Sequence, residues 1–122
     1  MSYDTSNVFA RILRGELPCR KVYEDEWALA FEDIHPAAPV HVLVIPKGPY
    51  VSLADFSAEA PDAAIAGFFR AVGKVADMAG VRESGYRVLA NHGPDSHQEV
   101  PHFHVHILAG RKLGPMLAPQ HR

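Results

Sequence analysis

The segment PHFHVHILAG, at residues 101–110, places a histidine at every second position, and this alternation constrains the fold more than any other feature of the chain. The alternating residues are the histidines His102, His104 and His106 and the apolar Phe103, Val105 and Ile107. Successive side chains of a strand point to opposite faces of a sheet, and alternate ones lie about 6.5–7 Å apart. The pattern therefore predicts a strand with an apolar face packed beneath a helix. Its other face would expose three imidazoles that can converge on one small group.

Four interpretations fit such an imidazole face. It can be a solvated strand surface, or a zinc site of neutral imidazoles to which His92 and His97 could add ligands. It can hold a nucleophile, because a neutral imidazole can attack phosphorus and water can then break the phosphorus–nitrogen bond. Such a nucleophile needs a fixed tautomer, and repulsion among clustered rings helps to keep it unprotonated. It can also be a phosphate or nucleotide sensor without turnover, and the residue pattern alone leaves all four open.

The remaining segments predict an α+β domain with a mostly antiparallel sheet. Besides the histidine strand, apolar and β-branched clusters predict strands at residues 20–25, 27–33, 40–46 and 85–91. A short amphipathic helix is expected within residues 6–16. Apolar residues then recur at three- and four-residue steps between residues 57 and 80, which predicts a long helix that begins at Ser57 or Asp62. This helix would cover one face of the sheet.

Length and composition narrow the class of protein. A chain of 122 residues suits one domain. Its net charge is −2, with scattered Lys and Arg, which argues against a duplex DNA or RNA partner. Cys19 is the only cysteine, so neither an internal disulfide nor a cysteine-based zinc cluster can form within one chain. Apolar runs are too short for a membrane span or a signal-peptide core, so we expect a cytoplasmic protein without a membrane partner.

Several segments resemble the histidine-triad (HIT) superfamily, in particular its histidine triad nucleotide-binding branch. They are VFARILRGELP, LAFEDIHPAAPVHVLVIPK, GYRVLANHG and QEVPHFHVHILAGRKLGPML, which together reach across residues 8–117. The resemblance implies a five-stranded antiparallel sheet with one long and one short helix. It also implies a homodimer whose two sheets join, supported locally only by the apolar tail LGPML. The whole chain, residues 1–122, would be a single HIT domain with a core at about 7–117 and a tail at 113–122.

The same resemblance implies an activity and the residues that perform it. Proteins of this branch hydrolyse purine nucleoside phosphoramidates and related AMP or GMP conjugates, without a metal or other cofactor. By position in the motif, His104 would attack the α-phosphorus and form a nucleotidyl-histidine. His106 would contact phosphate oxygens, and His102 would support the nucleophile mainly through its backbone carbonyl. His41 matches a further histidine beside the triad, although a hydrogen-bonded core histidine fits its position equally well.

Other positions match the nucleotide-binding residues of the family. Asp33 would hold the ribose hydroxyls, although a lone Asp at a strand end is also typical of a turn. The residues that the resemblance places around the base pocket, each of which taken singly fits plain core better, are Phe9, Ile12, Phe31, Ile34 and Leu43. Those expected around the phosphate, with backbone N–H groups as oxyanion donors, are Asn91, Gln98, Glu99 and Val100.

The chain also departs from the family pattern. Ser96 and His97 stand where many relatives have glycines, so the phosphate loop is expected to follow a different path. Glu99 replaces a serine that can donate to the leaving group, which an ionised carboxylate cannot do. Asn7 and Ala10 replace the cysteines of a structural zinc site, so no such zinc is expected. Two alternatives to the hydrolase remain: a non-catalytic nucleotide- or partner-binding module, and a histidine-ligated metal hydrolase.

Overall fold

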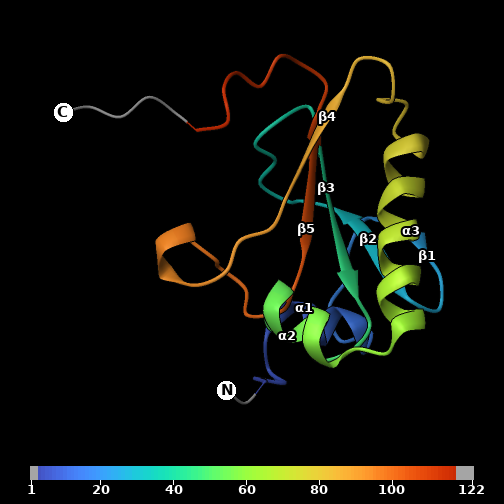
Figure 1. Cartoon of the computed structure of the whole chain (residues 1–122), viewed down its shortest axis with the longest axis vertical. Coiled ribbons are helices and arrows are strands. Elements are labelled where there is room, and N and C mark those ends of the chain that lie inside the picture. Colours follow the sequence, from blue (N-terminus) through green and yellow to red (C-terminus); the bar gives the residue numbers. More distant parts are fainter. Residues whose placement is uncertain (1–2, 118–122) are drawn as a thin grey trace.

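The computed structural model describes residues 3–117 (Figure 1). These residues form one antiparallel sheet with the strand order β1-β2-β3-β5-β4. The strands are β1 (Lys21–Glu24), β2 (Ala28–Glu32), β3 (Val40–Pro46), β4 (Tyr86–Leu89) and β5 (Val105–Ala109). The helices are α1 (Val8–Leu13), α2 (Leu53–Glu59) and α3 (Asp62–Met78), with a short 3-10 helix, η1, at Pro94–Ser96. The predicted α+β fold with a five-stranded antiparallel sheet is confirmed.

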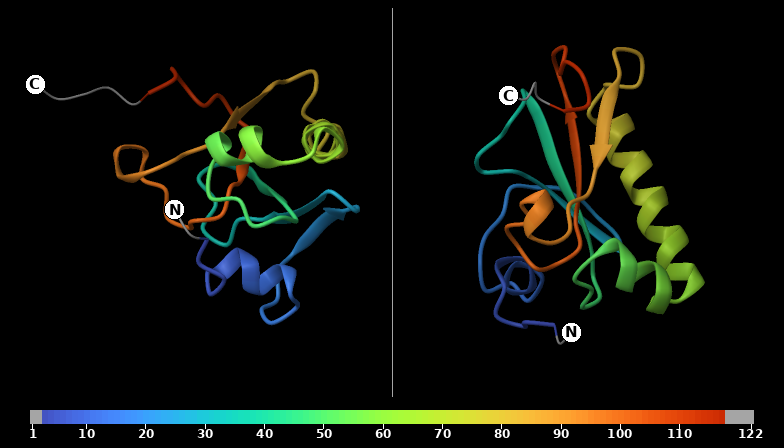
Figure 2. Two further views of the ribbon diagram at one scale, coloured as in Figure 1. Left: turned by 60° about the horizontal axis from the view of Figure 1, so that its bottom comes forward. Right: turned by 60° about the vertical axis from the view of Figure 1, so that its left-hand side comes forward.

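The sheet separates two apolar clusters, with α2 and α3 on one side and α1 on the other (Figure 2). The central strand β3 supplies both, because its side chains alternate: Val42 and Val44 enter the larger cluster, and Leu43 and Ile45 enter the smaller one. Phe68, Ala71, Val72 and Val75 of α3 lie in the larger cluster, together with Phe103, Val105 and Ile107. The apolar face of the histidine segment therefore packs beneath the long helix, as the alternation predicts.

The histidine segment is less regular than predicted, because β5 begins only at Val105. The backbone N–H of Phe103 donates to the carbonyl of Tyr50, and that of His102 donates to the carbonyl of Val100. These bonds turn residues 100–104 away from the ladder with β3. His102 and His104 thus lie before the strand, although their side chains still alternate with the buried Phe103.

The predicted single helix after residue 57 is wrong in its first part. Residues 53–59 form the separate helix α2, and Ser57 lies inside it. Ser52 and Asp55 form a capping box at its start, in which each side chain accepts from the other residue's backbone N–H. Pro61 then separates α2 from α3, which begins at Asp62, the second of the two predicted starts. The described chain therefore has one long and two short α-helices besides η1, so the expected single short helix is wrong.

β4 forms a free edge of the sheet, and its Tyr86 and Val88 are about half exposed, at 46% and 45%. After β5 the chain runs without helix or strand through residues 110–117, where Met116 and Leu117 are exposed. The rest of the predicted tail, residues 118–122, lies outside the described residues. The division into a core at about 7–117 and a tail from 113 stays a prediction.

Among residues 3–117, no helix is both long enough and apolar enough to cross a lipid bilayer.

Candidate active site

His104 is held in one tautomer by the backbone two residues earlier. Its Nδ1 lies 2.7 Å from the carbonyl oxygen of His102, which can only accept, so Nδ1 carries the proton and Nε2 carries the lone pair. The side chain is 6% exposed. Burial lowers the pKa of His104, and the bond to the His102 carbonyl opposes this only in part. A neutral imidazole with a free Nε2 lone pair is the form that a nucleophile requires.

His102 supports this arrangement from the interior. Its ring is fully buried, and its Nε2–H donates to the carbonyl of Pro46 at 3.0 Å. The hydroxyl of Tyr3 donates to the other ring nitrogen, Nδ1. Burial lowers the pKa of His102 to about 4, so the ring is neutral. The prediction of three imidazoles on an exposed face is therefore wrong for His102, whose ring is fully buried and whose carbonyl faces His104, and also for His104, which is buried as well.

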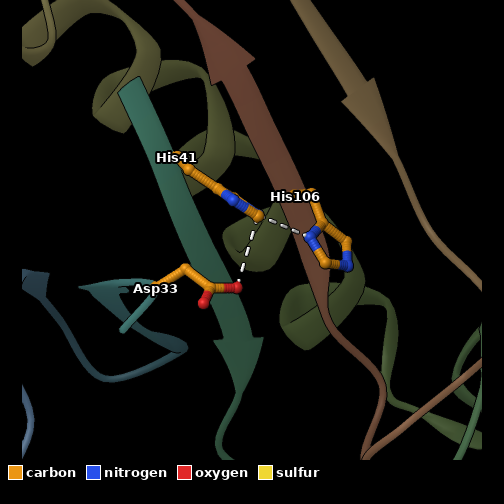
Figure 3. A group of neighbouring side chains, drawn as sticks. All are labelled: Asp33, His41 and His106. Atoms are coloured by element: carbon orange, nitrogen blue, oxygen red, sulfur yellow. Dashed lines mark hydrogen bonds and ion pairs between the residues drawn. The ribbon is translucent and has the colours of Figure 1, made fainter. Parts of the chain in front are cut away.

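His41, on β3, occupies the centre of a second hydrogen-bonded group (Figure 3). The backbone N–H of Ala37 donates to His41 Nδ1 at 2.9 Å, so the proton of the neutral ring is on Nε2. His41 Nε2 lies 2.9 Å from His106 Nδ1 and 3.4 Å from an oxygen of Asp33. Burial lowers the pKa of His41, and the nearby Asp33 charge opposes the shift. His41 is thus buried and hydrogen-bonded, yet it also lies directly against the triad.

His106, on β5, accepts a hydrogen bond at Nδ1 from the Nε2–H of His41, so its own proton is on Nε2. This Nε2–H is buried and finds no acceptor among residues 3–117. Burial, followed by the charges of His104 and His41, lowers the pKa of His106 to about 4. The rings of His104 and His106 lie 4.9 Å apart between centroids. A free lone pair on one ring and a free N–H donor on the other therefore lie close together.

Asp33 follows β2 and takes part in two interactions at once. One oxygen accepts from the backbone N–H of His35 at 2.8 Å, which is the turn that a lone Asp predicts. The other oxygen faces His41. Asp33, Ile34 and His41 line a cavity of about 210 Å³, whose other walls are Arg20, Glu32, Pro36 and Pro39. The carboxylate therefore lies at a cavity that it shares with His41.

Four of the five predicted base-pocket residues come together. Phe9, Phe31 and Leu43 are buried in the smaller apolar cluster, and Ile12 packs against it. The ring of Phe9 meets that of His104 edge-on, with 5.0 Å between centroids. Ile34 is not part of this cluster, because it lies in the turn after β2 and is 81% exposed. Ile34 instead lines the cavity beside Asp33, and the prediction that these five residues line a base pocket stays a prediction.

The predicted phosphate loop is braced from within by Gln98. The side-chain oxygen of Gln98 accepts from Gly93 N–H at 3.1 Å, and its nitrogen donates to the carbonyls of Val51 and Val100 at 2.9 and 3.1 Å. Its backbone N–H donates to the carbonyl of Gly93. The backbone N–H of Gln98, expected among the oxyanion donors, thus donates to Gly93, and its side chain holds the loop. That the loop surrounds a phosphate stays a prediction.

The rest of this loop is more exposed. Glu99 lies 2.9 Å from His97 Nε2, and both side chains are exposed. His97 has φ 62° and ψ 45°, a left-handed conformation that glycine adopts more easily. Val100 packs against the smaller apolar cluster, and Asn91 is half-buried after β4. The loop thus reaches the left-handed turn without the glycines of the family pattern.

The donor atoms of Asp33, His41 and His106 lie within 4.8 Å of one another, which is close enough for a metal ion. A metal at His41 would bind Nε2, the atom nearest the other two residues. The Ala37 N–H places the ring proton on that atom, so metal binding would cost either this hydrogen bond or a second ring deprotonation. The group is therefore better arranged for hydrogen bonding than for a cation.

An antiparallel five-stranded sheet with neutral, hydrogen-bonded imidazoles at the start of β5 defines the histidine-triad class of proteins. The family model described as the HIT domain matches residues 14–113. The chain belongs to the HIT family.

Known proteins resemble the chain over almost its whole length. An uncharacterised 13.2 kDa HIT-like protein of Azospirillum brasilense is 66% identical over 116 residues, which is 95% of each chain. The purine nucleoside phosphoramidase of Escherichia coli is 42% identical over 91% of this chain and 92% of its own. A HIT family hydrolase from Clostridium thermocellum superposes with a TM-score of 0.84 at 40% identity, covering 93% of this chain and 97% of that one.

Three contributors to the site were not predicted from the sequence. Ala37 acts through its backbone N–H, which no side-chain pattern reveals. Tyr3 lies 99 residues from its partner His102, and Arg111 lies 74 residues from the Ala37 carbonyl to which it donates. The prolines on both sides of the Ala37 loop, Pro36 and Pro39, were the only available sign of a fixed backbone there.

Proposed function

We propose that the chain is a nucleotide hydrolase of the histidine triad nucleotide-binding branch, which cleaves purine nucleoside phosphoramidates and related conjugates at the α-phosphorus. The observation that carries the proposal is the 2.7 Å bond from His104 Nδ1 to the His102 carbonyl. It leaves Nε2 as a fixed nucleophile with a free lone pair. Further support comes from the E. coli relative, whose name is purine nucleoside phosphoramidase.

The reaction proceeds in two displacements. His104 Nε2 forms a bond to the α-phosphorus while the phosphorus–nitrogen bond to the leaving amine breaks, and the amine takes the electron pair of that bond and a proton from solvent water. Water then attacks the same phosphorus and gives one proton to the solvent, the phosphorus–His104 bond breaks with its electron pair returning to Nε2, and the nucleoside monophosphate leaves. In both steps the Nε2–H of His106 donates to a phosphate oxygen, where negative charge develops.

Binding of the nucleoside uses the groups beside the histidines. Asp33 accepts hydrogen bonds from the two ribose hydroxyls, as its position at the cavity allows. Ile12, half-buried against the smaller apolar cluster, offers an apolar surface to the purine, with Phe9, Phe31 and Leu43 buried behind it. The Asn91–Val100 part of the loop surrounds the phosphate, with the Gln98 side chain as its brace rather than as a ligand. Ile34 covers the sugar from the exposed side of the cavity.

A rapid-quench experiment tests the proposal. The protein is mixed with adenosine 5′-phosphoramidate, and the quenched samples are digested and analysed by mass spectrometry for an adenylyl group on His104. We expect the adduct to appear and decay within one turnover. Turnover without any adduct, or an adduct on another residue, would contradict the mechanism. Tight AMP binding without turnover would instead favour the nucleotide- or partner-binding module.

We also propose that two chains associate through β4. This edge strand leaves backbone groups unpaired and exposes Tyr86 and Val88, and the apolar Met116 and Leu117 are exposed in the segment after β5. Pairing of two β4 edges would continue the sheet across a homodimer. Sedimentation equilibrium should give twice the mass of one chain, and a monomer at micromolar concentration would contradict the proposal. We propose separately that the protein is cytoplasmic, which cell fractionation tests.

A further inference from the structure

We propose that the backbone N–H of Ala37, positioned by Arg111, selects the tautomers of His41 and His106 and thereby makes His106 a hydrogen-bond donor toward the ligand. His41, Ala37 and Arg111 are positioning residues in this scheme, because each acts through a neighbour. The inference rests on the proposed function only in taking that ligand to be a phosphate. The tautomers themselves are a property of the free protein.

The first step is the contact between Ala37 and His41. A neutral imidazole has one N–H and one lone pair, and a backbone N–H can only donate. The Ala37 N–H lies 2.9 Å from His41 Nδ1, so this nitrogen must carry the lone pair. The opposite tautomer would direct two N–H groups at each other inside a site where His41 is only 8% exposed. The amide of Ala37 therefore fixes the proton of His41 on Nε2.

The second step passes this choice to His106. His41 Nε2–H lies 2.9 Å from His106 Nδ1, which must accept and therefore carries no proton. Asp33 reinforces the same choice, because its carboxylate oxygen at 3.4 Å attracts a proton on His41 Nε2. His106 is left with its proton on Nε2, on the side of the ring away from His41 (Figure 3).

The third step is what the free Nε2–H can do. It is buried and has no acceptor among residues 3–117, which is a costly state for a polar group. A phosphate oxygen next to His104 would supply the missing acceptor. If the tautomers were reversed, His106 would present a lone pair to that oxygen, and the contact would be repulsive. The direction of the whole chain of hydrogen bonds therefore decides whether His106 attracts or repels an anion.

Arg111 holds the loop from which this chain starts. Its Nη2 donates to the carbonyl of Ala37 at 3.2 Å, and its Nη1 donates to the carbonyl of Lys112 at 2.9 Å. Gly110 allows the close approach, because a Cβ at this position would lie 2.8 Å from Cβ of Pro39. Arg111 directly follows Gly110 at the end of β5, the strand that carries His106. The segment that carries His106, the donor toward the ligand, thus also carries Arg111, which holds the Ala37 loop in place.

Long-range ¹H–¹⁵N spectra of the free, ¹⁵N-histidine-labelled protein test the tautomers directly, since protonated and bare ring nitrogens differ widely in ¹⁵N shift. We expect both His41 and His106 to carry the proton on Nε2. A proton on Nδ1 of either ring would overturn the inference, whether or not the protein hydrolyses nucleotides. Failure of phosphoramidate turnover with the expected tautomers would instead contradict the proposed function alone.

Two variants at His41 test whether its hydrogen bond, rather than its bulk, fixes the tautomer of His106. His41→Gln can still donate from its amide nitrogen to His106 Nδ1, so His106 should keep the proton on Nε2. His41→Leu removes the donor, and His106 should then show a mixture of tautomers together with weaker AMP binding. The same His106 spectrum in His41→Leu as in the wild type would overturn the role of His41.

Arg111→Met tests the hydrogen bond from Arg111 to the Ala37 carbonyl, and Lys112→Met is its matched control. Arg111→Met should lower kcat/KM by about 2- to 30-fold, the range typical of coupling through a positioned neighbour. It should also broaden the ¹⁵N signals of His41 as the Ala37 loop loosens. Lys112→Met removes an exposed charge but keeps both Arg111 bonds, and should leave rate and spectrum unchanged. Equal effects of the two substitutions would overturn the role of Arg111.

Discussion

The Nδ1 atom of His104 donates to the carbonyl oxygen of His102, 2.7 Å away and only two residues earlier in the chain. This bond forms because residues 100–104 bend out of the ladder before β5 begins. In a regular strand the carbonyl of His102 would be directed at a neighbouring strand. The bend therefore converts a backbone acceptor into the group that fixes the tautomer of the proposed nucleophile.

Replacing His104 with alanine should lower kcat for adenosine 5′-phosphoramidate by about 10³-fold or more, because no other ring offers a free lone pair at this position. Binding of AMP, measured by calorimetry, should stay within about threefold of the wild type. His35→Ala is the matched control, since it removes an exposed imidazole outside the triad. Full activity of the His104 variant would contradict the covalent mechanism.

Treatment with EDTA should leave the rate unchanged. The proposed mechanism draws its nucleophile and its donor from His104 and His106, and the Ala37 N–H disfavours a metal at His41. The measurement is the steady-state rate before and after chelation and dialysis, and then after addition of zinc. Loss of activity with EDTA and recovery with zinc would support the metal hydrolase instead.

Substituting Asp33 with asparagine should lower kcat/KM for a ribonucleotide substrate by about tenfold, because hydrogen bonds to a charged acceptor weaken when the charge is removed. The matching 2′-deoxynucleotide lacks one of the hydroxyls and should lose much less. The measurement is the ratio of the two kcat/KM values in wild type and variant. An equal loss on both substrates would show that Asp33 acts through His41 rather than through ribose.

The protein should become less stable as the pH falls from about 6.5 toward 4. Burial lowers the pKa of His102 to about 4, whereas the ring in the unfolded chain titrates near 6.5. Between these values the unfolded state binds the extra proton, so the free energy of unfolding falls with pH by an amount on the order of 3 kcal/mol for this ring. Urea unfolding at pH 7, 6 and 5 measures the slope. A stability that does not change over this range would refute the neutral, buried state of His102.

The capping box of α2 should contribute measurably to stability. Ser52→Ala leaves the first turn without its side-chain acceptor, and should lower the free energy of unfolding by about 1 kcal/mol. Ser57→Ala is the matched control in the same helix, because the Ser57 side chain is exposed and should matter by less than about 0.5 kcal/mol. Thermal unfolding of both variants checks the difference.

Hydrophobic pattern predicted the strands well but not all of the helices. The run VHVLVIP predicted a strand at residues 40–46, and β3 has these bounds because its apolar residues fill both sides of the sheet until Pro46. The helix α2 escaped prediction because it is only seven residues long. Its signal was local, namely Ser52 followed three residues later by Asp55, and Pro61 marked the break before α3.

The candidate site was predictable where side chains alone define it. The histidines and Asp33 are brought together as the motif implied, but their tautomers depend on backbone groups of His102 and Ala37. The resemblance places Gln98 around the phosphate with its backbone N–H as a donor, and no sequence pattern shows that this N–H donates to Gly93. Only the loop geometry, which brings Gly93 and Val51 within reach of Gln98, reveals that it holds the loop together.

The alternation around β5 gives neighbouring side chains different roles, and this limits which changes in chain length the protein can tolerate. Phe103, Val105 and Ile107 serve the cluster beneath α3, while the intervening imidazoles serve chemistry. Inserting or deleting one residue here would invert the facing of every side chain beyond it. The folded structure and the proposed activity would then be lost together. This segment can therefore change during evolution by substitution of single residues, but not by insertion or deletion of one residue.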